Sequence, residues 1–239
     1  EMWSTAILEL NPETGLIDWE WHLWDHLVQD FDSTKANFGI TSDNPHLVDI
    51  NYVGQGQNTV NGPADWIHAN SIDYNEELDQ IVISSRVFSE FWIIDHSTST
   101  TEAATGQGGN SGMGGDLLYR WGNPISHKQG YEEDRMLYGQ HDVQWIKNGL
   151  PGQGNILLFN NGRNRPEGNY STIDELSLPA NGYNYNIDSN ISFSAVFIWS
   201  YSSLDPFDFY ADHISGCQRL GNGNTLICNG PIGTFFEVD

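Results

Sequence analysis

The chain has 239 residues, enough for one large β domain or two small ones. Its 9 Trp, 10 Tyr, 11 Phe and 25 Gly favour strands and turns. The 32 acidic and 9 basic residues give a formal net charge of −23, which disfavours nucleic acid and anionic membranes as partners. No run is long and apolar enough to span a membrane.

The first predicted elements are two strands, residues 6–10 and 16–21, joined by a turn. Residues 24–65 form a long segment rich in Asp, Asn and Gly, in which we expect a short helix at residues 24–31. The loop of residues 99–115 is rich in Gly, Thr and Ser, and we expect it to be mobile. Long loops of this kind usually lie over one face of a β fold and shape its site.

Three similar phrases recur along the chain, each opening on a histidine. The histidines are His68, His141 and His213, spaced by 73 and 72 residues. Each phrase runs into a strand built on Ile or Leu, and each is preceded by a strand that ends in aromatic residues. The preceding strands lie at residues 16–21, 117–121 and 196–201, and closing strands follow at residues 91–95 and 235–239. The second unit shows no clear closing strand.

This unit of four strands predicts an all-β fold, a β-propeller with four-stranded blades. A β-sandwich does not explain the repeat, and a β-helix repeats at a shorter period. No linker interrupts residues 1–239, so we expect a single domain. About three units and an opening strand pair are present, whereas propellers generally need four or more blades. Either the chain is part of a larger ring, or strands within the long loops complete it.

The two cysteines, Cys217 and Cys228, flank a hairpin with Asn-Gly turn chemistry. A four-residue loop over residues 221–224 would place Leu220 opposite Thr225 and Cys217 opposite Cys228, which would allow a cross-strand disulfide. A shift of one residue would leave two free thiols. Both alternatives stay open.

Several stretches together resemble the bacterial and archaeal arylsulfotransferases, which transfer sulfuryl groups without the nucleotide donor. The resemblance rests on the order and spacing of Asp65-Trp66-Ile67-His68-Ala69-Asn70-Ser71, residues 85–96, Gln140-His141-Asp142-Val143-Gln144, residues 154–163, and residues 213–227. It implies a six-bladed propeller with the site at its central channel. It further implies that His213 is the nucleophile, that His68 and His141 assist it, and that Arg163 binds the transferred group.

The chemistry explains why such residues are needed. A neutral imidazole can attack sulfur and leave again, which gives a sulfohistidine intermediate and ping-pong kinetics. Arg163 offers a planar fork of donors to sulfate oxygens, and a second imidazole can protonate the departing phenolate. Asn70 and Arg86 are assigned to substrate binding. Arg86 occupies the place in the first unit that Arg163 holds in the second, although it could instead pair with Glu90.

The predicted function is therefore sulfuryl transfer from an aryl sulfate ester to a phenol, with no cofactor and no metal. The alternative is a non-catalytic secreted propeller that binds a glycan or a protein partner. Further alternatives are a metal site formed by the three histidines and a quinone-dependent dehydrogenase, for which no cofactor cradle is recognisable. The acidic composition and the sequons at Asn169 and Asn190 favour an extracytoplasmic protein, periplasmic or secreted. The oligomeric state stays open.

Overall fold

The computed structural model describes residues 2–52, 64–187 and 193–239. An all-β fold is confirmed: antiparallel sheets dominate, and the described helices are short. The first complete sheet has the order β5 (Ala69–Asn75), β6 (Gln80–Ser85), β7 (Glu90–Asp95), β8 (Tyr119–Trp121). The second has the order β9 (His141–Trp145), β10 (Ile156–Asn160), β11 (Thr172–Ser177), β14 (Val196–Tyr201).

Smaller sheets flank these two. A three-stranded sheet at the C-terminal end contains β15 (Gly216–Arg219), β16 (Thr225–Asn229) and β17 (Thr234–Val238). The N-terminal end has the pair β1 (Ala6–Leu10) and β2 (Ile17–His22). Two short pairs are β3 (Leu27–Val28) with β4 (Val48–Asp49), and β12 (Ala180–Asn181) with β13 (Asn184–Tyr185). The described helices are α1 (Thr100–Ala103) and the 3-10 turns η1 (Leu23–His26), η2 (Thr41–Asp43), η4 (Pro124–His127), η5 (Glu132–Asp134), η6 (Pro206–Asp208) and η7 (Gly230–Ile232).

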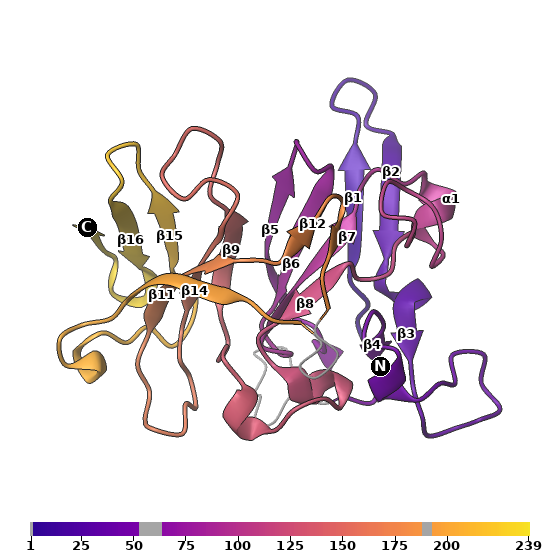
Figure 1. Ribbon diagram of the computed structural model, residues 1–239, viewed down its shortest axis with the longest axis horizontal. Helices are drawn as coiled ribbons and strands as arrows, with labels where there is room; N and C mark the ends of the chain where they lie inside the picture. Colours follow the sequence, from indigo (N-terminus) through magenta and orange to yellow (C-terminus); the bar gives the residue numbers. More distant parts are fainter. Residues whose placement is uncertain (1, 53–63, 188–192) are drawn as a thin grey trace.

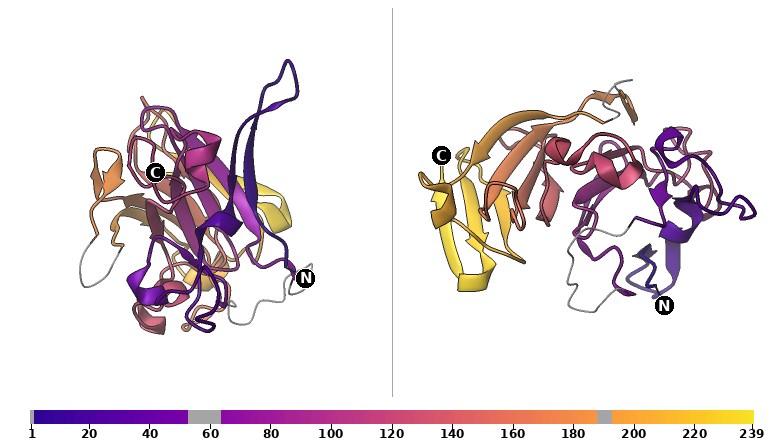
Figure 2. Two further views of the ribbon diagram at one scale, coloured as in Figure 1. Left: turned by 90° about the vertical axis from the view of Figure 1, so that its right-hand side faces the viewer. Right: turned by 90° about the horizontal axis from the view of Figure 1, so that it is seen from below.

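The sheets stand side by side along an open arc, which is clearest when the molecule is seen from below (Figure 2). Their first strands, β5, β9 and β15, lie next to one another (Figure 1). Side chains of one first strand bind the backbone of the next. Ser71 Oγ accepts from the Val143 amide at 2.9 Å, and Asp142 Oδ2 accepts from the Cys217 amide at 2.7 Å. These bonds hold the beginnings of the sheets together.

The core consists of the layers between successive sheets rather than one central mass. Trp21, Trp92 and Ile94 fill the layer between the N-terminal pair and the first complete sheet. Other clusters fill the next two layers: Phe91, Trp145 and Leu158 in one, and Phe159, Ile173 and Ile227 in the other. Because neighbours cover both faces of β6 and β7, every residue of these strands is buried. Trp66, Trp92 and Trp145 are all buried in these layers.

The strand grouping differs from the prediction by one strand. Each aromatic-ended strand was expected to open the unit of the histidine that follows it, but β8 pairs with β7 and β14 pairs with β11. These strands therefore close the sheet of the preceding histidine. A repeat defines the period of a unit, but only backbone pairing decides where the unit begins.

The strand missing from the second predicted unit is β11, whose sequence is Thr-Ile-Asp-Glu-Leu-Ser. Asp174 and Glu175 interrupt the apolar pattern expected of a buried strand, yet both side chains are buried. Asp174 accepts from the Ser200 hydroxyl at 2.6 Å, and Glu175 forms an ion pair with Arg219 at 2.6 Å. Partners on other strands therefore make this polar strand compatible with burial.

Two loop segments contain structure that the sequence did not indicate. Residues 99–115 include α1, which begins at a capping box formed by Ser99 and Glu102, and Ala103 is buried. The Trp21 indole donates to the Gly115 carbonyl at 2.8 Å and anchors the end of this segment. The helix expected at residues 24–31 is only the 3-10 turn η1, which passes directly into β3.

The register of the C-terminal hairpin settles the cysteine question. Arg219 lies opposite Thr225, so Cys217 faces Ile227, and Cys228 faces Gly216. Both thiols are free. Of the two alternatives, the structure has the one with free thiols, one residue away from the register that pairs Cys217 with Cys228, because Leu220 belongs to the turn, where its amide binds the Asn224 carbonyl.

None of the described helices has the length and apolar character required to cross a membrane.

Candidate active site

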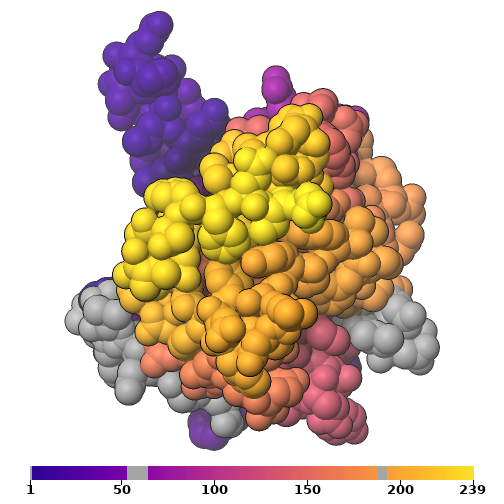
Figure 3. All heavy atoms as spheres, turned by 90° about the vertical axis from the view of Figure 1, so that its left-hand side faces the viewer, coloured from indigo at the N-terminus to yellow at the C-terminus, as the bar shows by residue number. Residues whose placement is uncertain are grey.

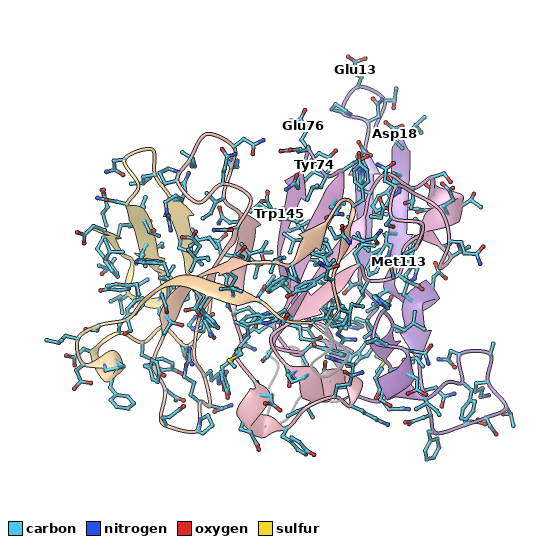
Figure 4. The ribbon with its side chains drawn as sticks, in the orientation of Figure 1. Glu13, Asp18, Tyr74, Glu76, Met113 and Trp145 are labelled. Atoms are coloured by element: carbon cyan, nitrogen blue, oxygen red, sulfur yellow. The ribbon has the colours of Figure 1, made fainter. Side chains whose placement is uncertain are left out.

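The three repeated histidines stand at the entrances of β5, β9 and β15. A left-handed residue accompanies each one: His68 itself (φ 49°), Asp142 (φ 55°) and Ile214 (φ 44°). The ladders are also irregular beside the first two histidines. The left-handed residue redirects the backbone into each strand. The histidines precede or open β5, β9 and β15, whereas Tyr74 and Trp145 lie toward the far ends of β5 and β9 (Figure 4).

His141 is the buried member of this set, with 8% of its surface exposed. Its Nδ1 lies 2.7 Å from Oδ1 of Asn161, which is itself fully buried. Burial, reinforced by the positive charges of Arg86 and His68, lowers the pKa of His141 to about 4 in spite of that hydrogen bond. The imidazole is therefore neutral at neutral pH, and Nε2 is its unprotonated nitrogen when Nδ1 carries the hydrogen.

His68 and His213 differ from His141 because each pairs with a carboxylate. His68 Nδ1 lies 2.5 Å from Oδ2 of Asp65, and His213 Nδ1 lies 2.5 Å from Oδ1 of Asp212. The His213 side chain is 55% exposed, whereas the His68 side chain is 26% exposed. The bond to His213 lowers the pKa of Asp212, and the charge of Arg163 adds to this effect. A carboxylate on Nδ1 orients each ring and leaves Nε2 for proton transfer.

Two arginines lie among these histidines. The Arg86 amide donates to the His68 carbonyl at 3.2 Å, and the Arg163 amide donates to the Tyr138 carbonyl at 3.2 Å. Burial, and next the like charge of Arg163, lower the pKa of Arg86, which is 5% exposed. Two guanidinium groups close enough to repel each other are favourable for an oxyanion. The ion pair of Glu90 is with Arg120, at 2.6 Å, so the first complete sheet has its own internal ion pair.

Asn70, the other residue assigned to substrate binding, stands beside the site. Its Nδ2 donates to the Gln140 carbonyl at 2.7 Å, immediately before His141. Its Oδ1 is buried and accepts no hydrogen bond from the described part of the chain. Asn70 therefore holds the entrance of β9 against β5.

The structure brings the predicted site residues into one region. His68, His141, Arg86 and Arg163 are linked by the contacts and charges described above, and His213 joins them through Asp212. Four contributors were missing from the prediction: Asp65, Asn161, Asp212 and the Gln140 carbonyl. Asp65 and Asp212 precede His68 and His213 by three residues and one residue, a spacing that allows a local carboxylate–imidazole pair. Nothing in the local sequence indicates that Asn161 reaches His141.

The metal hypothesis lacks the geometry that it requires. Within residues 2–52, 64–187 and 193–239, no group of three or more His, Cys, Asp or Glu side chains is arranged to hold a metal ion.

Comparison with protein families identifies the chemistry that such a site serves. The family model described as Arylsulfotransferase (ASST) matches residues 2–238. The chain belongs to the arylsulfotransferase family. No curated protein matches the sequence significantly. As an arylsulfotransferase, the chain is assigned in general terms to the transfer of aryl sulfate groups, and the match covers all three histidine phrases.

Proposed function

We propose that this arylsulfotransferase moves a sulfuryl group from an aryl sulfate ester to a phenol through a covalent sulfohistidine, with His141 as the nucleophile. One observation carries the proposal. A buried, neutral imidazole has a single tautomer favoured by its partner on Nδ1, and it lies within the electrostatic reach of Arg86. That combination supplies a nucleophile and positive donors without a metal or a cofactor.

In the first half-reaction, Nε2 of His141 attacks the sulfur, an N–S bond forms and the S–O bond to the aryl group breaks. The electron pair of the broken bond leaves with the phenolate, which takes a proton from His68 or His213. Arg86 and Arg163 bind the non-bridging oxygens, where charge is concentrated in the loose transition state expected by analogy with phosphoryl transfer. The phenol then departs.

The second half-reaction reverses these steps with a different phenol. The acceptor hydroxyl gives its proton to the imidazole that lost one, its oxygen attacks sulfur, and the N–S bond breaks to return neutral His141. The paired carboxylates Asp65 and Asp212 support this cycle because they orient the rings of His68 and His213 through Nδ1. Ping-pong kinetics follow from the covalent intermediate.

The nucleophile proposed here is not the one that the resemblance implies. His213 was expected to attack sulfur, yet its side chain is more than half exposed and it is paired with Asp212. An exposed sulfohistidine would be open to hydrolysis, and a carboxylate on Nδ1 orients a ring for proton transfer through Nε2. These two differences favour His141 as the nucleophile and His213 as an acid–base group.

We also propose that the sheets are blades of a β-propeller whose first strands line its central channel. Two complete four-stranded sheets, a common order of strands within them and the arc in Figure 2 support this architecture. In such a ring the entrances of β5, β9 and β15 converge on the axis, which would gather the histidines. An extracytoplasmic location is a further proposal, supported by the acidic composition, and fractionation of cells that express the whole protein tests it.

The decisive experiment is intact-mass spectrometry after brief exposure to a phenyl sulfate ester, followed by peptide mapping under mildly basic conditions that preserve N–S bonds. We expect one added SO3 on the wild type and on His213→Asn, and none on His141→Asn. An adduct mapped to His213 would retain sulfuryl transfer but reject His141 as the nucleophile. Absence of both adduct and phenol release from the folded wild type would reject the function and favour the binding-protein alternative.

A further inference from the structure

Asn161 occupies a special position between two of the repeated histidines. It directly follows β10 and is fully buried. On one side its Oδ1 meets Nδ1 of His141 at 2.7 Å. On the other side its Nδ2 donates to the carbonyls of Ala211 at 2.8 Å and Ile214 at 3.0 Å, which bracket His213. A single amide thus touches the second sheet and the segment that enters the third.

The two carbonyls determine the orientation of this amide. The amide NH2 group has two hydrogens, and it donates one to the carbonyl of residue 211 and the other to the carbonyl of residue 214. A flipped amide would place its oxygen against those two oxygens. The group that faces His141 is therefore the acceptor Oδ1, and Nδ1 of His141 must carry the hydrogen.

A second bridge holds the same two segments together. The Ser171 hydroxyl donates to the Asn161 carbonyl at 2.9 Å and accepts from the Ala211 amide at 3.0 Å. The backbone of Asn161 is thus held at a fixed distance from the segment that carries His213. Because both the backbone and the side-chain amide of Asn161 are held, little further conformational entropy is lost when this amide orients the ring of His141.

On the basis of the function proposed above, we propose that Asn161 is a positioning residue. It fixes His141 in the Nδ1–H tautomer, which directs the Nε2 lone pair to the sulfur, and it couples that ring to the segment that places His213. It touches neither substrate nor the reacting atoms, and it acts through His141.

An amide suits this role better than a carboxylate. An aspartate at this position would also accept from Nδ1, but its charge would stabilise imidazolium and remove the lone pair from Nε2. It would also face two carbonyl oxygens without a hydrogen to donate. The other charged groups that act on His141 are Arg86 and His68, and both oppose its protonation. An amide orients the ring and leaves it neutral.

The first test needs no substitution and no turnover. Imidazole ¹⁵N chemical shifts of the wild type, with His141 assigned by comparison with His141→Asn, report which nitrogen carries the hydrogen at neutral pH. We expect protonated Nδ1 and unprotonated Nε2. The opposite tautomer, or a mixture of the two, overturns the inference irrespective of whether the protein transfers sulfuryl groups.

The second test compares Asn161→Asp and Asn161→Ala with the exposed control Asn148→Asp. In Asn161→Asp, the pH below which the rate of sulfuryl labelling falls should rise by about one to three units. In Asn161→Ala, the labelling rate should fall on the order of 10²-fold, and the ¹⁵N shifts should move toward a mixture of tautomers. Asn148→Asp should match the wild type, since this residue lies in an exposed loop.

The outcomes separate the two proposals. If the wild type is labelled on His141 but neither the pH dependence of labelling nor the ¹⁵N shifts change in Asn161→Asp, the positioning role is rejected and the proposed function stands. If the wild type is never labelled but shows the expected tautomer, the proposed function fails and the contact with Asn161 keeps only a structural meaning.

Discussion

His141 and His213 stand 72 residues apart at matching places in a repeat, yet their surroundings are opposite. The first has 8% of its surface exposed and binds an amide, whereas the second has a side chain that is 55% exposed and binds a carboxylate. The sheet of His141 has a neighbour on both sides. The three-stranded sheet that follows His213 lies at one end of the arc of described sheets (Figure 3). Matching places in a repeat therefore do not give matching surroundings.

The largest expected effect comes from removing the buried imidazole. His141→Asn should lower kcat by more than about 10³-fold, because it removes the buried neutral nucleophile beside Arg86. His213→Asn should lower kcat by about 10²-fold, which is the usual contribution of a general acid or base. Steady-state phenol release and single-turnover labelling measure both values. An equal loss in the two variants, with labelling abolished in both, would remove the distinction between them.

The arginines allow a similar comparison at a smaller scale. Arg86 is buried next to His68, whereas Arg163 is half-buried. Arg86→Ala should reduce kcat/KM by about 10²–10³-fold, since a charge within a buried site stabilises a transition state more strongly than one near water. Arg163→Ala should reduce it by about 10-fold. Comparison of kcat/KM for an aryl sulfate in the two variants tests this order, and a larger loss for Arg163→Ala would reverse it.

Burial of His141 also predicts a dependence of stability on pH. The pKa of His141 is about 4 in the folded protein against an ordinary value of 6.5, so the unfolded chain takes up a proton first on acidification. Stability attributable to this group is present above about pH 6.5, falls as the pH decreases, and is lost near pH 4. The wild type should lose about 3 kcal/mol more than His141→Asn over this range. Urea denaturation at several pH values measures the difference, and parallel curves for the two proteins would contradict it.

The smallest expected effect concerns the end sheet. Because Cys217 and Cys228 are free and out of register, a reducing agent should leave Tm unchanged. Burial raises the pKa of the Cys217 thiol, so a maleimide should label the half-buried Cys228 first in the folded protein. Mass spectrometry of labelled peptides provides the order. A shift in Tm on reduction would reveal a disulfide that the hairpin register does not allow.

Much of the fold could be predicted because strands have local signatures. The strands at residues 6–10 and 196–201 match β1 and β14, and the first strand of each unit begins at its histidine or within three residues after it. The failures have a common cause. The acidic strand β11 and the packed loop around α1 depend on partners distant in sequence, such as Arg219 and Trp21. A local pattern contains no information about such partners.

The sequence by itself determined the all-β class, the period of the units and the matching places of His68, His141 and His213 in the repeat. Only the tertiary structure decided which imidazole is buried, which ones meet a carboxylate, and that Asn161 spans from His141 to the segment of His213. Asn161 lies 20 residues from His141 in the sequence and also binds carbonyls 50 and 53 residues away. Desolvation and hydrogen bonding of this imidazole therefore follow from tertiary packing and not from its own motif.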